Sequence, residues 1–193
     1  MTQRLDYTAI APAGIKALGS VYGYVVQSGL PRLLVNLVYL RVSQINGCAY
    51  CIDMHSRDLI KEGLAVEKLV LVQAWREAGS LFDPRERSAL AWAETVTRVA
   101  DTAVPDADFQ AASAVFSEKE LADLTIAIGL MNAFNRWPSD FGFRRRPHVL
   151  SSRIRLSRPI PHRSTLGCWP SSASNNLPEL AKINRQFDKP STF

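Results

Sequence analysis

The sequence has only three cysteines in 193 residues, and two of them are close neighbours. Small secreted proteins that depend on disulfides carry many more cysteines at regular intervals, so this class of protein is excluded. The close pair, Cys48 and Cys51, is better interpreted as a catalytic or metal-binding pair. The third cysteine, Cys168, stands alone in a segment of different composition.

Long hydrophobic runs are also missing. No stretch approaches the ~20 consecutive apolar residues of a membrane span, and residues 1–4 lead into no apolar segment typical of a signal peptide. We therefore expect no membrane partner and a cytoplasmic location. With 47% apolar residues, a chain of this length suffices for one domain with its own core, or for one domain plus an appendage.

A third absence concerns β-structure, because no segment convincingly alternates apolar and polar residues in the period-2 pattern of a strand. Residues 12–136 instead show helical periodicity, which predicts an all-α fold. Helix start and stop signals, including two capping boxes, separate the predicted helices. The predicted helices cover about 12–28, 31–46, 48–62, 66–78, 84–100, 105–116 and 118–136.

Three of these helices have a well-defined apolar face that should point into the core. The first presents Ile15, Leu18, Tyr22 and Val25. The second presents Leu34, Leu37, Val38, Val42 and Ile45. The last presents Leu121, Leu124, Ile128 and Met131.

Charge is distributed unevenly along the chain. Residues 138–193 contain 10 Lys and Arg against 3 Asp and Glu, whereas residues 1–137 contain 13 against 15. The later segment is rich in proline, serine and asparagine, which is typical of a loop, an arm or a disordered tail. We therefore divide the chain into a helical domain, 1–137, and a basic tail, 138–193. Because the tail lacks interleaved aromatic residues and a known binding module, a solvated segment is favoured over a nucleic-acid partner.

The strongest functional pattern is formed by Cys48, Cys51 and His55. At helix positions i, i+3 and i+7 they lie on one face. Cysteines three apart in the first helical turn can form a disulfide with little backbone movement, and a helix N-terminus favours thiolate over thiol. His55, one turn beyond Cys51, can accept or relay a proton. We predict a redox dithiol, in which a thiolate attacks a peroxide and the neighbouring thiol converts the sulfenic acid to a disulfide.

Other uses of paired thiols must be compared with this prediction. A closed zinc site needs a fourth ligand, and only His148, His162 or Cys168 in the tail offers one, so we expect no metal or cofactor. Covalent haem attachment requires a histidine directly after the second cysteine, where this chain has Ile52. A thioredoxin domain needs alternating strands and helices. A structural pair of buried thiols stays open, because cysteine is readily buried as a small hydrophobe.

Polar residues near the cysteines are less informative. Asn36, on the preceding helix, is expected to face the thiols, where its amide can hydrogen-bond a water but cannot act as a base. Tyr50 either donates a hydrogen bond or packs its ring. Ser43, Gln44 and Asn46 are interpreted as residues that satisfy the tight turn before the site.

Four stretches resemble the alkylhydroperoxidase AhpD-like branch of the carboxymuconolactone decarboxylase family. The similarity is most specific in residues 40–55, which contain the cysteine pair, and it continues in residues 74–78, 85–94 and 128–136. Together these stretches span roughly residues 15–137. The resemblance implies an all-helical fold that assembles into homo-oligomers. It also implies peroxidase or disulfide-reductase activity, with a hydroperoxide substrate and an external dithiol or disulfide reductant.

The resemblance also assigns roles to the site residues. Cys51 corresponds to the cysteine that becomes the sulfenic acid, Cys48 to the proton donor and resolving thiol, and His55 to the relay histidine. Peroxidase members of the family have a glutamate at the position of Asn36, and a histidine occurs at the position of Tyr50. An amide cannot pass a proton as a carboxylate does, so we expect weaker peroxidase activity or a different role.

Two further functions therefore stay open. One is a redox-sensing or binding protein whose dithiol changes a partner contact without efficient turnover. The other is a lactone decarboxylase like the namesake of the family, although such members generally lack the paired cysteines.

Overall fold

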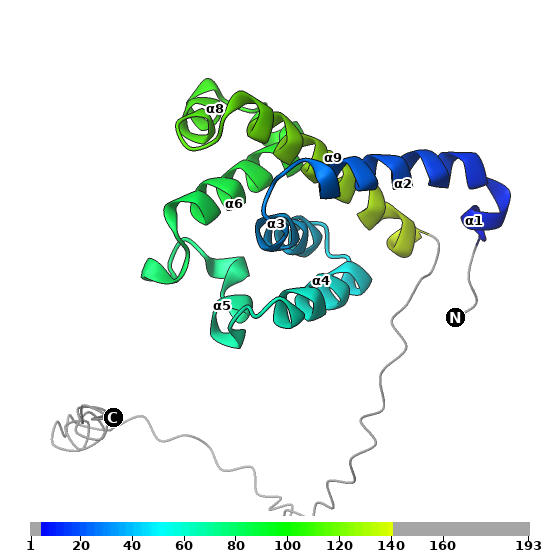
Figure 1. Ribbon diagram of the computed structural model, residues 1–193, viewed down its shortest axis with the longest axis horizontal. Helices are drawn as coiled ribbons and strands as arrows, with labels where there is room; N and C mark the ends of the chain where they lie inside the picture. The colour runs from blue at the N-terminus through cyan, green and yellow to red at the C-terminus, as the bar shows by residue number, and fades with distance from the viewer. Residues whose placement is uncertain (1–4, 141–193) are drawn as a thin grey trace, which may run out of the picture. The chain divides into compact units, whose positions relative to one another are not determined.

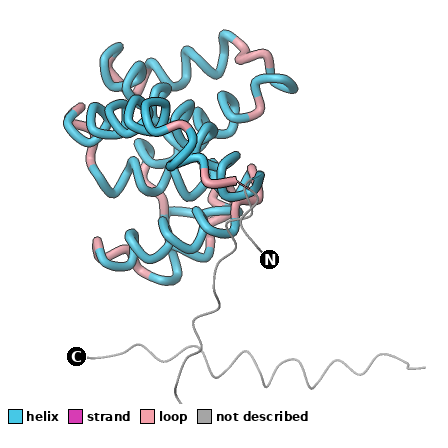
Figure 2. Tube along the Cα trace, turned by 90° about the vertical axis from the view of Figure 1, so that its right-hand side faces the viewer, coloured by secondary structure: helices cyan, strands magenta, loops and turns pink. Residues whose placement is uncertain are grey.

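The computed structural model describes residues 5–140, and it describes them as helices joined by short turns (Figure 1). Figure 2 shows helix and loop but no strand in this part of the chain, which confirms the all-α prediction. No helix within these residues is long and apolar enough to cross a membrane. The α-helices are α1 (Tyr7–Ile10), α2 (Pro12–Gln27), α3 (Arg32–Ile45), α4 (Ala49–Lys61), α5 (Val66–Val70), α6 (Pro84–Thr97), α7 (Val99–Thr102), α8 (Asp106–Ser113) and α9 (Glu118–Asp140).

Local capping signals set several of the helix ends as predicted. Asp83 accepts a hydrogen bond from the Glu86 N–H (2.8 Å), and Glu86 accepts one from the Asp83 N–H (2.9 Å), so a complete capping box starts α6. Gly29 and Gly63 follow α2 and α4 with φ of 95° and 89°, a left-handed conformation that glycine adopts without strain.

The predicted helix over 66–78 is wrong in extent. It ends at Val70, and two short 3-10 helices, Val72–Ala74 and Gly79–Leu81, follow before α6. Arg87 of α6 donates hydrogen bonds to the backbone carbonyls of Trp75, Arg76 and Gly79, which satisfies acceptors that an irregular turn leaves free. This contact comes from tertiary structure, so local periodicity could not reveal it. The predicted helix over 84–100 likewise divides into α6 and α7, and α9 runs past 137 to Asp140.

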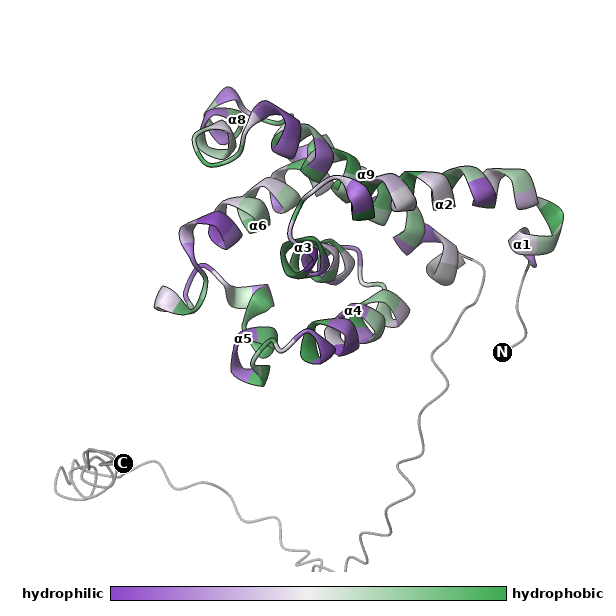
Figure 3. Ribbon diagram, in the orientation of Figure 1, coloured by the Kyte–Doolittle hydropathy of each residue, from purple (hydrophilic) through white to green (hydrophobic). Residues whose placement is uncertain are grey.

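Helix α3 is the centre of the described body, in contact with α4, α6 and α9 (Figure 1). Its predicted core residues Leu34, Leu37, Val38 and Val42 are buried, whereas Ile45 is half-buried. Figure 3 shows both hydrophobic and hydrophilic colours on α3 and on α4, as expected for helices that each bury one face. All four predicted core residues of α9 are also buried.

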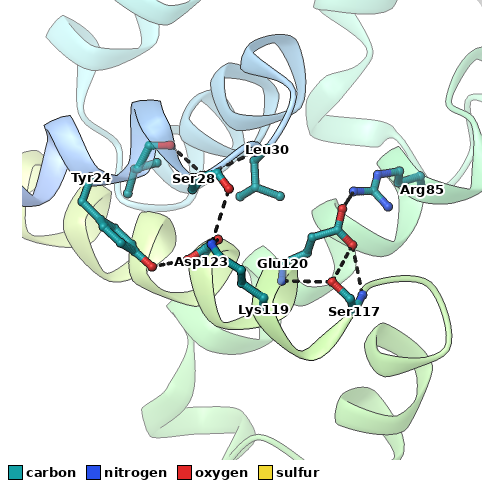
Figure 4. Close-up of polar contacts among 9 residues, drawn as sticks. Tyr24, Ser28, Leu30, Arg85, Ser117, Lys119, Glu120 and Asp123 are labelled. Atoms are coloured by element: carbon teal, nitrogen blue, oxygen red, sulfur yellow. Dashed lines mark hydrogen bonds and ion pairs between the residues drawn. The ribbon is translucent and has the colours of Figure 1, made fainter.

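Helix α2 packs less completely than its periodicity predicts. Val25 is buried, but Tyr22 is 48% exposed, because α2 lies at the edge of the body and packs mainly on α1 and α9. Its C-terminal end is fixed to α9 by a polar cluster (Figure 4). Tyr24 donates a 2.6 Å hydrogen bond to Asp123, and Lys119 donates both to Asp123 (2.5 Å) and to the Ser28 carbonyl (3.4 Å).

A buried carboxylate joins α3 to α6. Glu94 accepts hydrogen bonds from Arg41 (2.7 Å), Trp75 (2.9 Å) and Arg76. Burial alone would raise the pKa of Glu94, but the hydrogen bonds from these three partners and the charge of Arg41 lower it below its ordinary value. The central helix is therefore held against α6 by an ion pair as well as by apolar packing.

Candidate active site

The two cysteines lie where a loop turns from α3 into α4. Cys48 is the N-cap residue of α4, its Sγ accepts the Cys51 N–H (3.4 Å), and its own N–H donates to the Ser43 carbonyl (3.0 Å). Both thiols are free and buried, with Cys48 1% and Cys51 3% exposed. Their Sγ atoms lie 2.7 Å apart. A small movement therefore suffices to join them in a disulfide.

Polar side chains from α3 and α9 surround the Cys51 sulfur. Ser43 and Asn135 both hydrogen-bond to this sulfur, and Asn135 Nδ2 also donates to Ser43 Oγ (3.0 Å). Asn46 Nδ2 donates to both Asn132 Oδ1 and Asn135 Oδ1 at 2.9 Å, which leaves the NH₂ group of Asn135 to face Ser43. The turn residues Ser43 and Asn46 thus contact α9 and the site, in addition to shaping the turn.

Burial dominates the acidity of Cys51. It raises the pKa of the Cys51 thiol to about 12, and the contact with Cys48 adds to this rise, while the hydrogen bonds from Asn135 and Ser43 oppose it. A helix N-terminus favours thiolate, but burial opposes this preference for Cys51 in the free protein. Cys51 is therefore a neutral thiol at pH 7.

His55 shares the buried face of α4 with Cys51 and Leu59, as the helical spacing predicts. It is 4% exposed, its ring lies against that of Tyr39 with centroids 5.2 Å apart, and neither ring nitrogen has a hydrogen-bond partner. Burial lowers the pKa of His55 to about 4, with a small opposing effect from Asp58. His55 is therefore neutral at pH 7, with one nitrogen as donor and the other as acceptor.

A cavity of about 530 Å³ lies among α2, α3, α4 and α9. His55 and Tyr39 lie on its wall, whereas neither cysteine does. His55 is thus the one residue of the predicted triad that lines the cavity. The other lining residues are Gly19, Tyr22, Val25, Val26, Leu30, Arg32, Val35, Asn36, Met54, Asp58, Met131 and Phe134.

Asn36 faces α4, but at the opposite end of that helix from the cysteines. Its Nδ2 donates to Glu62 Oε1 (2.8 Å), and the same oxygen pairs with Arg32 Nε (2.6 Å). Glu62 Oε2 is buried without a hydrogen-bond partner. The expected contact between Asn36 and the thiols is therefore replaced by a contact with a carboxylate.

The sequence alone predicted no function for the side chains of Tyr39 and Asn135. It placed Ser43 only in the turn before the site. A signal was present, because Asn36, Tyr39 and Ser43 occupy i, i+3 and i+7 of α3, the same spacing as the two cysteines and His55. Two polar stripes with this spacing on adjacent antiparallel helices can face each other.

The metal alternative finds no support in the described part of the chain. Within residues 5–140, no group of three or more His, Cys, Asp and Glu side chains could hold a metal ion. The remaining candidates, His148, His162 and Cys168, lie outside the described residues. The same is true of the predicted basic tail beyond residue 140.

An all-helical body with a Cys-x-x-Cys pair at the start of a core helix defines a helical dithiol protein with an AhpD-like fold. The chain belongs to the carboxymuconolactone decarboxylase family, whose sequence profile matches residues 12–95. The uncharacterized protein YdfG of Bacillus subtilis is 36% identical over 136 residues, which cover 70% of this chain and 92% of YdfG.

Solved structures agree with this assignment. ATU0492 of Agrobacterium tumefaciens, a protein of unknown function described as a candidate AhpD antioxidant defence protein, superposes with a TM-score of 0.71 at 36% identity, over 75% of this chain and 99% of its own. A peroxidase-related protein of Ralstonia eutropha with an alkylhydroperoxidase AhpD core shares the fold, with a TM-score of 0.63 at 22% identity, over 72% of this chain and 74% of its own. These similarities confirm the predicted family and fold.

Proposed function

We propose that the protein is a thiol-dependent peroxidase of the AhpD-like type. In the first step Cys51 Sγ attacks the distal oxygen of a hydroperoxide, the O–O bond breaks, and the products are Cys51 sulfenic acid and an alcohol. Cys48 Sγ then attacks the Cys51 sulfur, which releases water and leaves a disulfide. An external dithiol reduces this disulfide and is itself oxidised, which completes the cycle.

The observation that carries this proposal is the 2.7 Å separation of the two free Sγ atoms. A sulfenic acid formed on Cys51 would have its resolving thiol already in contact, so a second oxidation by peroxide would compete poorly with disulfide formation. Burial of both sulfurs also keeps bulk water away from the sulfenic acid. These features support a two-electron dithiol cycle over a purely structural pair.

Proton transfer is the demanding step, because Cys51 starts as a thiol. His55 is neutral and its nitrogens are unpartnered, so it can accept the thiol proton through a bridging molecule and pass it to the leaving oxygen. Ser43 and Asn135 donate hydrogen bonds that stabilise the developing negative charge on sulfur. We assign His55 the relay role on this basis.

A second function is favoured by the raised pKa and deep burial of Cys51. Both lower the population of reactive thiolate, which suits a redox sensor that oxidises slowly and then changes its contacts. The two functions differ in turnover. A peroxidase consumes many equivalents of hydroperoxide per protein when a dithiol is supplied, whereas a sensor consumes about one.

We also propose that the protein forms homo-oligomers, as its family resemblance implies. Exposed apolar side chains support this, since Tyr22, Val26 and Met54 together border the cavity and are 48%, 61% and 37% exposed. Light scattering on the full chain gives the assembly size, and a strictly monomeric protein at micromolar concentration would contradict the proposal.

The peroxidase is tested with cumene hydroperoxide and dithiothreitol, by following hydroperoxide consumption over many equivalents. Cys51→Ser should abolish consumption. Cys48→Ser, treated with one equivalent of hydroperoxide in the absence of dithiothreitol, should stop at a sulfenic acid that dimedone traps. Cys168→Ser, which removes the remaining cysteine, is the matched control and should keep full activity. Unchanged turnover in Cys51→Ser would contradict the proposal. If a variant without both thiols still decarboxylates a lactone, a lactone decarboxylase is favoured instead.

A further inference from the structure

Two buried polar groups lie side by side on the wall of the cavity without hydrogen-bond partners. Tyr39 Oη belongs to a side chain that is 1% exposed, and the two nitrogens of His55 belong to one that is 4% exposed. Buried polar groups in folded proteins almost always have partners, so an unpaired neighbouring set calls for an explanation. A ligand in the cavity would supply the missing partner to both residues at once.

We propose that this cavity binds an uncharged, largely apolar molecule, and that one oxygen of the ligand accepts a hydrogen bond from Tyr39 Oη while contacting His55. The inference rests on the proposed function in one respect, which is that this oxygen is the leaving oxygen of the hydroperoxide. Because neither cysteine lines the cavity, the distal oxygen must then pass beside His55 to meet Cys51 Sγ. Tyr39 then becomes a substrate-binding and catalytic residue that the cysteine motif alone does not reveal.

The size and lining of the cavity fit an apolar molecule. Its volume of about 530 Å³ is in the range of small-molecule sites in proteins, roughly 300–1,000 Å³. Apolar side chains from three helices line it, among them Val25 of α2, Val35 of α3, and Met131 and Phe134 of α9. An aliphatic or aromatic group of the ligand would therefore bury its surface here.

The charge state of the wall favours an uncharged ligand. His55 is neutral at pH 7, and burial raises the pKa of Tyr39 far above its ordinary value, so its hydroxyl stays protonated. The charged lining residues are Arg32, whose side chain is 81% exposed and pairs with Glu62, and Asp58, whose side chain is 32% exposed and pairs with Lys61. A charge placed next to Tyr39 would lose its hydration without gaining a buried counter-ion.

Tyr39 has a defined part in the reaction. When the sulfur–oxygen bond forms and the O–O bond breaks, negative charge develops on the leaving oxygen, and the hydroxyl of Tyr39 stabilises it by hydrogen bonding. The proton that makes this oxygen an alcohol comes from the Cys51 thiol through His55. Tyr39 itself keeps its proton throughout, so it positions the leaving oxygen without acting as an acid.

Isothermal titration calorimetry tests binding without turnover. The probes are cumyl alcohol, the unreactive alcohol product of cumene hydroperoxide, and cumene, which has the same apolar part without the oxygen. Both are titrated by calorimetry into the full-length wild type and into Tyr39→Phe, which removes one oxygen atom and keeps the ring against His55. The loss of one hydrogen bond should weaken cumyl alcohol binding roughly tenfold and leave cumene binding unchanged.

Each other outcome overturns the inference. Failure of cumyl alcohol to bind the wild type at millimolar concentration removes the site. If Tyr39→Phe binds both probes more weakly by the same factor, Tyr39 has only a structural role. If the variant and the wild type bind cumyl alcohol equally well, there is no hydrogen bond from Tyr39 to the ligand. Because these probes do not react, the two proposals can fail separately. If the expected binding pattern is found in a protein without peroxidase activity, only the proposed function is refuted. If the protein is a peroxidase but Tyr39→Phe binds both probes as the wild type does, only the role of Tyr39 is refuted.

Discussion

The side chain of Asn36 donates a 2.8 Å hydrogen bond to Glu62, the residue that follows the last turn of α4. Glu62 is eleven positions from Cys51 on α4, about 16 Å along the helix axis at the usual rise per residue. The Arg32 guanidinium also compensates its charge. Glu62 is therefore too distant from the thiols to relay their proton, which supports the proposed assignment of the relay to His55.

Replacing Glu62 by Gln tests this distinction. The change removes the charge but keeps an oxygen that can accept from Asn36, so peroxidase activity should change less than about threefold, which is a barrier change below about 1 kcal/mol. His55→Ala should lower the rate of hydroperoxide consumption by more than tenfold, because a proton relay contributes about 100-fold or more. Equal losses in the two variants would contradict the assignment of the relay to His55.

Ser43→Ala should make Cys51 less reactive. The variant removes one hydrogen bond that stabilises the thiolate, so the already raised pKa of Cys51 should rise further. The measurement is the rate of Cys51 alkylation by iodoacetamide as a function of pH, with peptide mapping to separate the cysteines. Ser20→Ala, in which the lost hydroxyl only bonds to its own helix on the exposed side of α2, is the control. An alkylation profile identical to that of the wild type would show that Ser43 does not act on the thiol.

Acid should destabilise the protein through His55. In the unfolded chain its pKa is about 6.5, and in the folded protein it is about 4, so the unfolded state binds more protons between these values and stability rises with pH across this window. Lowering the pH from 7.5 to 4.5 should cost roughly 2–3 kcal/mol through this residue. Urea unfolding at several pH values measures the slope, which should be reduced in His55→Asn. A slope that is the same in both proteins would show that His55 is not the group responsible.

Glu94→Gln should destabilise the fold without altering the site directly. Loss of the carboxylate leaves Arg41, only 11% exposed, without its counter-ion, and breaking a buried ion pair typically costs about 3–5 kcal/mol. Because the pKa of Glu94 is lowered in the folded state, its stabilising effect is present above the unfolded pKa of the carboxyl and is lost as the pH falls below it. Urea unfolding at pH 7 is the measurement, and Glu77→Gln, at an exposed position, should be nearly neutral. Equal stability of the two variants would contradict the structural role of Glu94.

Local features of the sequence predict much of this fold. The capping box at Asp83 and the glycines after α2 and α4 act within a few residues, so their signals are complete in the sequence. The shared face of Cys51 and His55 follows from helical periodicity alone. The break after Val70 does not, because it depends on hydrogen bonds from the distant Arg87.

The chemistry of the site was less accessible to sequence reasoning than its position. A helix N-terminus favours thiolate, but the extent of burial decides the acidity of Cys51, and burial is a property of the packed body. The contacts of Asn135 with Ser43 and Asn46 join residues about ninety positions apart. The cavity beside Tyr39 likewise exists only because four helices leave a space among them.

The central claim is that Cys48 and Cys51 act as one redox pair. It is tested most directly by treating the reduced full-length protein with one equivalent of cumene hydroperoxide and mapping its peptides by mass spectrometry. We expect a disulfide between Cys48 and Cys51, a loss of two hydrogen atoms, and full return of both thiols after addition of dithiothreitol. Two thiols that both stay open to alkylation after denaturation, or oxidation confined to Cys168, would contradict it.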